Sequence, residues 1–515
     1  MTRAPSEHAA ADQEVTLRRG AIGLPGALAS TLSNMAPVEG IFIVLVLVAA
    51  GMGTLSVWAF LVGAIGILLT AWNVGQLAKR VPSAGSYVGF AFHGAGAVRR
   101  SWARPGAAFT FYLSLFSAPI TLAAVVVFLG SWLQASLGLP NAWWLVISLV
   151  AVLATSAFVL PGVDASARTA FVLFALEAGG LAVICIAVLA RSGDALDAPL
   201  HAGGGSPGGW GGLLGITFAT AVSGFVGWEN SLGMTEEIRR PKRVIPVAML
   251  GSITVVALLY LLASWAATSG YVHWLGEDAG AARLGDITNA APFVELADHY
   301  APWFTWGVIA IGAISPAACY VAGMTACSRW TYASARGGLL PAPLARLSSA
   351  TRVPAAAFWL WTAAVTALVV VPYVLLDGNA VEIAAYEAGI GTVPLLLVYL
   401  GISLLTPVLV WRRDRSSFRV VSHVLPPAVA VLVLGYGIVE FVLPDQPAPA
   451  DTFWIYIATI IGLAGVAAAV AVRRGGARLD TLGHLPEDED GEDLAVEPIV
   501  SRPHDLTAAV HDPKG

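Results

Sequence analysis

The residues NMAPVEGIF at 34–42 and SGFVGWENS at 223–231 each interrupt a long apolar stretch with helix breakers and one carboxylate, Glu39 or Glu229. A charged group in the middle of a lipid bilayer costs at least ~2.5–3.5 kcal/mol. Irregular backbone is tolerated at that depth only where protein or a water-filled cavity surrounds it. The two interruptions therefore predict a polar site near the middle of a membrane, built from two discontinuous helices.

The composition is that of a membrane protein. The chain has 57% hydrophobic and only 12% charged residues, with a mean hydropathy of +0.75, and that much apolar surface needs lipid around it. Apolar runs of about 17–25 residues bounded by charges predict an all-α polytopic fold with twelve transmembrane helices. Their expected ranges are 26–50, 54–78, 106–136, 142–160, 168–191, 212–234, 245–270, 302–334, 355–375, 387–411, 423–443 and 453–472.

The basic residues of the loops orient these helices. Of 28 Lys and Arg residues, 26 fall on one side of the predicted membrane, and only Arg191 and Arg283 fall on the other. Positive residues mark the cytoplasmic side. We therefore expect a multi-pass protein of the plasma (inner) membrane with both termini in the cytoplasm.

Two polar tails flank the twelve-helix domain, which we expect over 20–472. Residues 1–19 lack the apolar core of a signal peptide and predict a cytoplasmic N-terminal tail. Residues 473–515 include EDEDGED at 487–493 and predict a disordered, acidic cytoplasmic tail. Two interpretations of this tail remain open: it is a solvating segment, or it binds a regulator.

Missing motifs exclude several function classes. The sequence holds no GxxxxGK[ST] phosphate-binding loop and no soluble domain long enough for a nucleotide site, so ATP is not the direct energy source. Cys185, Cys319 and Cys327 fall inside predicted spans without metal-ligand spacing, and we interpret them as small core residues. We expect no cofactor, no metal and no nucleic-acid partner. Secondary transport, a channel and an intramembrane enzyme remain.

The positions of the two interruptions favour transport. They fall in the first and sixth predicted helices, so those helices enter the membrane from opposite sides. This arrangement is typical of an inverted repeat of five helices, with the binding site at the repeat interface. We expect repeat one over about 26–191, repeat two over about 212–411, and two further helices over about 423–472.

Three motifs on predicted cytoplasmic boundaries identify a family. They are LAKRVPSAGSY at 77–87, TEEIRRPKRVIPVAM at 235–249 and SARGGLLPAPLARL at 334–347. Over roughly residues 15–475 the chain resembles permeases of the amino acid-polyamine-organocation (APC) superfamily, which have the LeuT-type fold. The resemblance implies a secondary transporter, not an enzyme, that moves amino acids or related amines and polyamines. Its implied partners are the small-molecule substrate and the membrane lipids; the sequence does not give the oligomeric state.

The motif at 235–249 supplies candidate residues for a cytoplasmic gate. Acidic and basic side chains at a helix end can form interhelical ion pairs in one conformational state and release them in another. The candidates are Glu236, Glu237, Arg239 and Lys242. A second interpretation, compatible with the first, is that these charges control the topology of the chain and that Pro246 opens the next helix.

The first interruption departs from the family pattern. Members usually carry glycine-serine-glycine there, and the free N–H groups of that stretch bind a substrate carboxylate. Aligning on GIF places Val38, Glu39 and Gly40 at these positions. A carboxylate there repels a substrate carboxylate and attracts an ammonium group. The substrate-binding candidates in this helix are Asn34, Met35, Ala36, Pro37, Val38, Glu39 and Gly40.

Two other roles remain open for Glu39. It is protonated or turned away while the backbone still binds an amino acid carboxylate, or it caps the second half of the helix and never touches substrate. Helix six supplies the other wall of the site, where glycine lets the backbone approach a ligand and aromatic rings offer faces to a cation. The candidates there are Ser223, Phe225, Val226, Gly227 and Trp228.

Three acids are candidates for proton coupling. Glu229 matches a glutamate that some proton-dependent members use, with a permanently neutral interhelical glutamic acid as the alternative. Glu177 falls where many members carry a lysine beside the sodium site, so it binds a cation, carries a proton or pairs with Arg168. Glu39 is the third. We expect proton symport, with substrate exchange (antiport) as the alternative and an intramembrane enzyme or a transporter-like sensor after it.

Overall fold

The computed structural model describes residues 20, 22–81, 86–160, 166–201, 208–235, 237–289, 291–336, 339–348, 351, 353–376, 378–444, 446 and 450–475. Within these residues all long regular elements are helical, and the one extended pairing is a parallel bridge between Ile22 and Ile238.

The α-helices are, in chain order, α1 (Leu24–Met35), α2 (Pro37–Met52), α3 (Ser56–Arg80), α4 (Tyr87–Val98), α5 (Ala103–Ser136), α6 (Trp143–Val159), α7 (Ser166–Leu189), α8 (Ile216–Ser223), α9 (Asn230–Gly233), α10 (Pro241–Leu275), α11 (Glu277–Leu284), α12 (Pro292–Tyr300), α13 (Thr305–Arg336), α14 (Ala355–Leu375), α15 (Ala380–Arg413), α16 (Val420–His423), α17 (Leu425–Val442) and α18 (Phe453–Gly475). Short 3₁₀ helices lie at Gly53–Leu55, Arg100–Trp102, Gly193–Leu200, Gly209–Leu214, Pro302–Phe304, Ala342–Ala345, Arg415–Ser417 and Ala450–Thr452.

The helices have the length and composition of membrane spans. In the part of the chain that the structure describes, nine helical stretches are long and apolar enough to cross a membrane, and Trp143–Val159 is a shorter apolar helix. The stretch Leu24–Arg80 has 57 residues and contains α1, α2 and α3. This all-helical architecture agrees with the expected all-α polytopic membrane protein.

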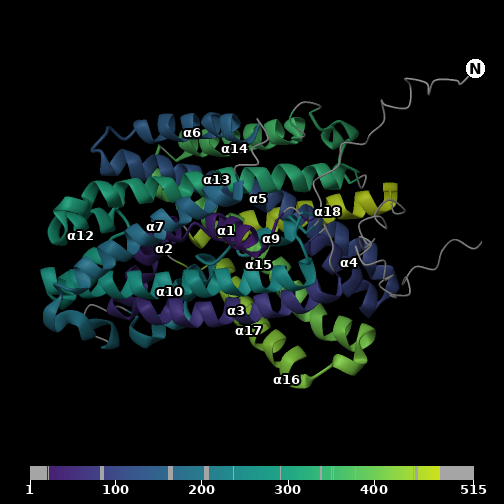
Figure 1. Ribbon diagram of the computed structural model, residues 1–515, viewed down its shortest axis with the longest axis horizontal. Helices are drawn as coiled ribbons and strands as arrows, with labels where there is room; N and C mark the ends of the chain where they lie inside the picture. The colour runs from purple at the N-terminus through teal and green to yellow at the C-terminus, as the bar shows by residue number, and fades with distance from the viewer. Residues whose placement is uncertain are drawn as a thin grey trace, which may run out of the picture.

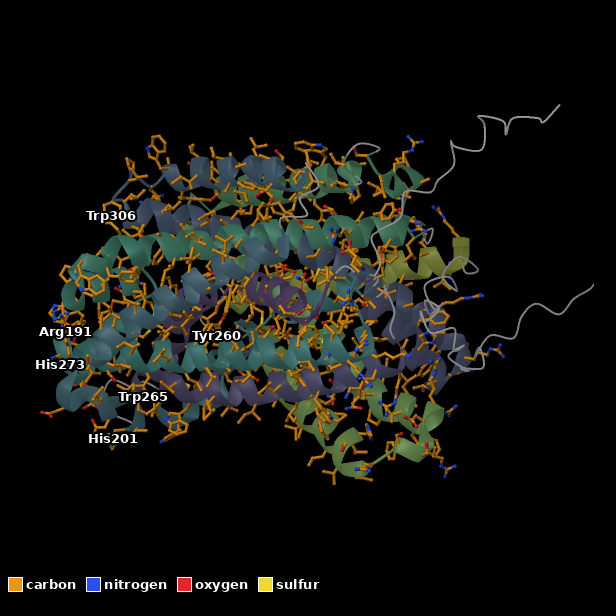
Figure 2. All side chains as sticks on the ribbon, in the orientation of Figure 1. Arg191, His201, Tyr260, Trp265, His273 and Trp306 are labelled. Carbon is orange, nitrogen blue, oxygen red and sulfur yellow. The ribbon has the colours of Figure 1, made fainter. Side chains whose placement is uncertain are left out.

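The long helices lie side by side along the long axis of the molecule (Figure 1). Helices α6 and α14 form one edge, α16 and α17 lie at the opposite edge, and α12 lies at the end away from α4 and α18. Arg191, which the charge pattern assigned to the minority side, lies at the α12 end (Figure 2). Arg283 lies there too, because it pairs with Glu295 of α12.

Three helices lie outside the predicted spans. Helix α4 follows the first of the cytoplasmic boundary motifs and packs its apolar residues against α5 and α15. It was missed because its twelve residues are too few to cross a bilayer. Helices α11 and α12 form a cap beside α10, where Arg283 pairs with Asp286 and Glu295. Hydrogen bonds from the hydroxyl and N–H of Thr288, together with the charge of Arg283, lower the pKa of Asp286 below its usual value.

Close helix packing depends on small residues at the contacts. Gly130 of α5 faces α6, where the Ser148 hydroxyl donates hydrogen bonds to the carbonyl oxygens of Val126 and Trp144, both at 2.8 Å. A Cβ atom at Gly130 would lie 2.2 Å from Ser148 Oγ and 2.3 Å from the Trp144 oxygen. The two helices therefore approach as closely as small-residue interfaces allow in membranes.

We expect Gly130→Ala to lower the thermal stability of the purified protein, because its methyl group would overlap the α6 backbone. Overpacking of this kind costs about 1–3 kcal/mol. Gly401→Ala in α15 is the matched control, since nothing lies within 4 Å of a Cβ atom there. The measurement is size-exclusion chromatography after heating in detergent. Equal stability of the two variants would contradict the close α5–α6 contact.

Candidate functional site

The first helix interruption is a single residue. Ala36 separates α1 from α2 with φ 43° and ψ 66°, in the left-handed region. Pro37 then opens α2, where its missing N–H costs nothing and its fixed φ suits the first helical turn. Val38, Glu39 and Gly40, which the family alignment placed in the interruption, instead form the first turn of α2. The interruption lies two residues before the expected register.

The second interruption spans the residues between Ser223, where α8 ends, and Asn230, where α9 begins. Gly227 lies there with φ 104°, a conformation that strongly favours glycine. Its N–H donates to Glu229 Oε2 at 3.1 Å, so the Glu229 carboxyl holds the turn. The Asn34 side chain donates to the Gly227 carbonyl oxygen at 3.0 Å. The two interruptions are therefore in direct contact.

The start of α2 is occupied by side chains of other helices. The Glu39 N–H donates to Ser315 Oγ of α13 at 3.2 Å. The Ser315 hydroxyl and the Val38 N–H act electrostatically on the Glu177 carboxyl of α7, but neither completes a hydrogen bond to it. Glu39 and Glu177 also interact with each other through their charges. A helix N-terminus carries a partial positive charge, and here it faces two acids of the protein itself.

Helix α13 contributes one face to the site. Ser315 and Cys319 are four residues apart, so they lie on the same side of the helix. The Cys319 Sγ donates to the carbonyl oxygen of Asn34 at 3.2 Å, near the end of α1. The sequence analysis interpreted Cys319 as a core residue and did not name Ser315. Both residues lie outside the three motifs, so the only feature of the sequence that linked them was their four-residue spacing in a predicted helix.

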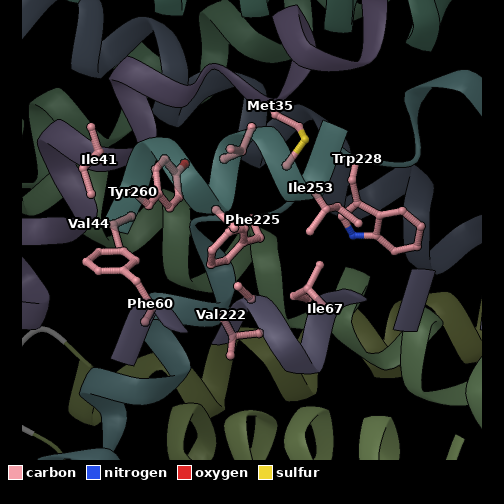
Figure 3. Close-up of a cluster of buried hydrophobic side chains, with 14 of the residues drawn as sticks. Met35, Ile41, Val44, Phe60, Ile67, Val222, Phe225, Trp228, Ile253 and Tyr260 are labelled. Atoms are coloured by element: carbon pink, nitrogen blue, oxygen red, sulfur yellow. The ribbon is translucent and has the colours of Figure 1, made fainter. Parts of the chain in front are cut away.

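Tyr260 of α10 lies between the two interruptions. Its hydroxyl donates to the Gly224 carbonyl oxygen, at the end of α8, at 2.6 Å. On the other side it lies against Gly40, where a Cβ atom would fall 2.0 Å from the hydroxyl oxygen. Figure 3 shows its ring near Phe225 and Phe60, with centroid distances of 5.0 Å and 5.5 Å. Figure 2 labels Tyr260 between the two ends of the bundle, and its side chain is fully buried.

A second group of side chains surrounds Glu229. The rings of Trp228 and Tyr399 lie 5.1 Å apart, and those of Tyr399 and Tyr87 lie 5.6 Å apart. Glu229 interacts electrostatically with both tyrosines. Trp228 is fully buried, and Figure 3 shows it apart from Phe225 and Tyr260. The predicted aromatic wall is therefore divided, with Phe225 beside Tyr260 and Trp228 directed to α15.

The predicted gate residues lie where α1 begins. The Ile22 N–H donates to the Glu237 carbonyl oxygen and the Arg239 N–H to the Ile22 carbonyl oxygen, both at 2.8 Å. The Glu237 carboxylate pairs with Arg329 of α13 at 2.6 Å, a partner that the sequence analysis did not identify. Lys242 lies in the first turn of α10. Glu236 lies outside the described residues.

The candidate site consists of acids, hydroxyls and aromatic rings. Among the described residues, no group of three or more His, Cys, Asp and Glu side chains is placed to hold a metal ion. The buried oxygens without a hydrogen-bond partner near the start of α2 are Oε2 of Glu39 and both carboxyl oxygens of Glu177, among the residues that the structure describes.

Comparison with known proteins decides the family. The family model described as Amino acid permease matches residues 22–466, nearly the whole chain. The chain belongs to the amino acid permease family. It is also similar to the uncharacterized amino acid permease YecA of Bacillus subtilis (strain 168), with 26% identity over 148 residues. That match covers 29% of this chain and 32% of the relative, so it spans about a third of the relative's length.

The family result confirms the resemblance drawn from the three boundary motifs. Together with the apolar helices, it identifies a multi-pass membrane permease.

We expect Gly227→Ala to destabilise the permease, because alanine is strained at φ 104° and its Cβ atom would lie 2.8 Å from the Asn34 carbonyl oxygen. The expected cost is about 1–3 kcal/mol. Gly233→Ala, at the end of α9, is the control, since nothing lies within 4 Å of a Cβ atom there. Thermal unfolding in detergent measures both variants, and an unchanged Gly227→Ala protein would rule out the described turn.

We expect Arg329→Gln to lower thermal stability, because it removes the charge that pairs with the Glu237 carboxylate. The Arg329 side chain is 36% exposed, so solvent screens the pair, and a coupling of about 0.5–1 kcal/mol is expected. A double-mutant cycle with Glu237→Gln measures this coupling, with exposed Arg346→Gln as the unpaired comparison. Strict additivity of the two substitutions would show that the ion pair contributes nothing.

Proposed function

We propose that this permease is a secondary active transporter that moves small amine-bearing solutes, amino acids or related amines such as polyamines, across the plasma membrane by alternating access. H+ is the proposed coupling ion. The observation that supports the substrate class is the charge at the start of α2, where the helix end already faces Glu177 and where Glu39 adds a second acid.

A substrate carboxylate is disfavoured at this position. It would approach two acids in a medium of low dielectric constant, where like charges a few ångströms apart repel by several kcal/mol. An ammonium group is attracted by the same acids and has three N–H donors for the surrounding oxygens. The rings of Phe225 and Tyr260 border the same region and can face a cation. The amine is therefore the part of the substrate that the site is proposed to recognise.

The proposed architecture has twelve spans in two inverted repeats of five, followed by two helices. The stretch Leu24–Arg80 is 57 residues long, far more than the ~20 that cross a bilayer, and it divides at Gly53–Leu55. If this stretch counts as two spans, the nine helical stretches of the described residues give ten spans. Adding α6 and the interrupted α8–α9 pair supports a total of twelve. The Ile22–Ile238 bridge joins the segment before α1 to the segment after α9, which supports an inverted repeat in which α1 starts and α9 ends on the same side.

The proposed orientation places the α4 and α18 end in the cytoplasm, together with both termini. It rests on the positive-inside rule, because the basic boundary motifs lie at helix ends on that side. In this orientation the Glu237–Arg329 pair and the Ile22–Ile238 bridge lie on the cytoplasmic side of the site. Glu237, Arg239 and Lys242, with Glu236, are the proposed gate, opening when these contacts separate.

Proton coupling is proposed through Glu39, Glu177 and Glu229, which lie at the two interruptions. Glu229 already accepts the Gly227 N–H, so a change in its protonation would loosen the turn between α8 and α9. Exchange of one solute for another uses the same site and is the alternative cycle.

A ligand screen tests the substrate class. We expect ethylamine or putrescine to raise the melting temperature of the purified permease, because a ligand at a hundredfold excess over its Kd stabilises the folded state by about 2.7 kcal/mol. Alanine and arginine complete the panel as zwitterionic and cationic amino acids. Glu39→Gln should abolish the shift, whereas Glu277→Gln, an exposed acid of α11, should keep it. Stabilisation by alanine alone, unaffected by Glu39→Gln, would refute recognition through an acid.

A further inference from the structure

Glu39 and Glu177 are a pair of buried acids with unused hydrogen-bonding capacity. Glu39 is 7% exposed and Glu177 is 0% exposed. Oε2 of Glu39 and both carboxyl oxygens of Glu177 are buried without a hydrogen-bond partner among the described residues. Buried polar atoms are almost always paired, so three unpaired oxygens at one place indicate that a donor is missing from the site as it stands.

No positive charge of the protein neutralises the pair in the described part of the chain. The titratable side chains that act on the two acids are Tyr260 of α10 and Cys319 of α13, with the Ser315 hydroxyl beside them. Arg168 is nine residues before Glu177 in α7, a separation of about 13.5 Å along the helix axis.

Most of the other charged or titratable groups on the helices around α2 lie toward helix ends. Arg283 of α11 is already paired with Asp286 and Glu295, and α11 packs near Ala49 and Ala50, about 15 Å along α2 from Glu39. Helix α8 has no titratable residue. The remaining groups are Cys185 of α7, Lys79 and Arg80 of α3, Lys242, Arg243, His273 and Tyr271 of α10, Glu277 and Asp278 of α11, Asp298, His299 and Tyr300 of α12, and Arg329, Tyr332 and Arg336 of α13, with Tyr320 and Cys327 farther inside α13.

Two carboxylates without a counter-ion cannot both stay ionised in a dry site, because desolvation and mutual repulsion each favour a bound proton. Such pairs titrate as one unit. We propose that Glu39 and Glu177 form a dyad that holds one proton in the empty permease, and that a substrate ammonium group binds by displacing this proton. The inference rests on the proposed amine substrate and specifies how the amine and the proton share the site.

The charge balance of this step fixes the direction of coupling. The dyad with one proton carries a single negative charge, and two carboxylates with one monovalent ammonium group carry the same charge. The displaced proton leaves to the side on which the site is open, and a proton from the other side replaces the amine when it is released. A monoamine and a proton therefore move in opposite directions with no net charge transferred. This is amine–proton exchange at the dyad, not movement of both in the same direction.

Calorimetric titration with ethylamine tests the exchange directly. Binding is measured near pH 7 in two buffers with different protonation enthalpies, and the difference in heat gives the number of protons released per amine. We expect about one proton for the wild-type permease. The apparent Kd should also rise about tenfold for each pH unit of acidification, since one proton competes with one amine; this readout needs no variant.

Two matched variants separate the dyad from other acids. Glu177→Gln removes the like charge beside Glu39, so ethylamine should still bind, but its affinity should begin to fall on acidification at a lower pH than in the wild type. Glu387→Gln removes another buried acid whose oxygens also lack a hydrogen-bond partner, in α15, and should leave the release at about one proton. A pH dependence of ethylamine binding to Glu177→Gln equal to that of the wild type would overturn the dyad. Ethylamine binding to the wild type without proton release would overturn the exchange but leave the amine transporter intact, whereas no binding by any amine of the panel would defeat the proposed function itself.

Discussion

The fold of the site depends on satisfying the backbone of two broken helices inside a membrane, where no lipid group can replace a lost hydrogen bond. Three free groups at the interruptions each meet a side chain from another helix. Ser315 accepts the Glu39 N–H, Cys319 donates to the Asn34 carbonyl, and Tyr260 donates to the Gly224 carbonyl. The interruptions are therefore held open by α10 and α13, and these two helices determine which polar atoms remain for a ligand.

Much of the fold was readable because its signals are local. Apolar length locates the spans, and a proline after Ala36 or a glycine at positive φ marks an interruption. The register of the first interruption was not readable, since only the three-dimensional path shows that Pro37 restarts the helix at once. Helix α4 was not predicted, because a search for apolar stretches long enough to cross a membrane passes over a short apolar helix that packs beside the spans.

The candidate site likewise contains residues that the sequence indicates and residues that it does not. Glu39, Glu177 and Glu229 were predictable from sequence because an acid in an apolar stretch needs a reason to be there. Tyr260 and Ser315 were not, because tyrosine and serine occur throughout membrane helices and only tertiary contacts bring these two to the interruptions. Residues such as these, which lie outside the motifs and meet only in the folded chain, are the part of a site that a single sequence conceals.

The three acids differ in what they have left to offer a ligand. One carboxyl oxygen of Glu229 accepts a hydrogen bond from the Gly227 N–H, and the side chain lies beside Tyr399. The Glu229 carboxyl is therefore part of the turn that it stabilises. Oε2 of Glu39 and both carboxyl oxygens of Glu177 accept no such bond among the described residues. A carboxyl that closes a turn is suited to sensing a change of conformation, and an unpaired carboxyl is suited to receiving a cation. The structure thus separates two roles that the sequence assigned to the acids as a group.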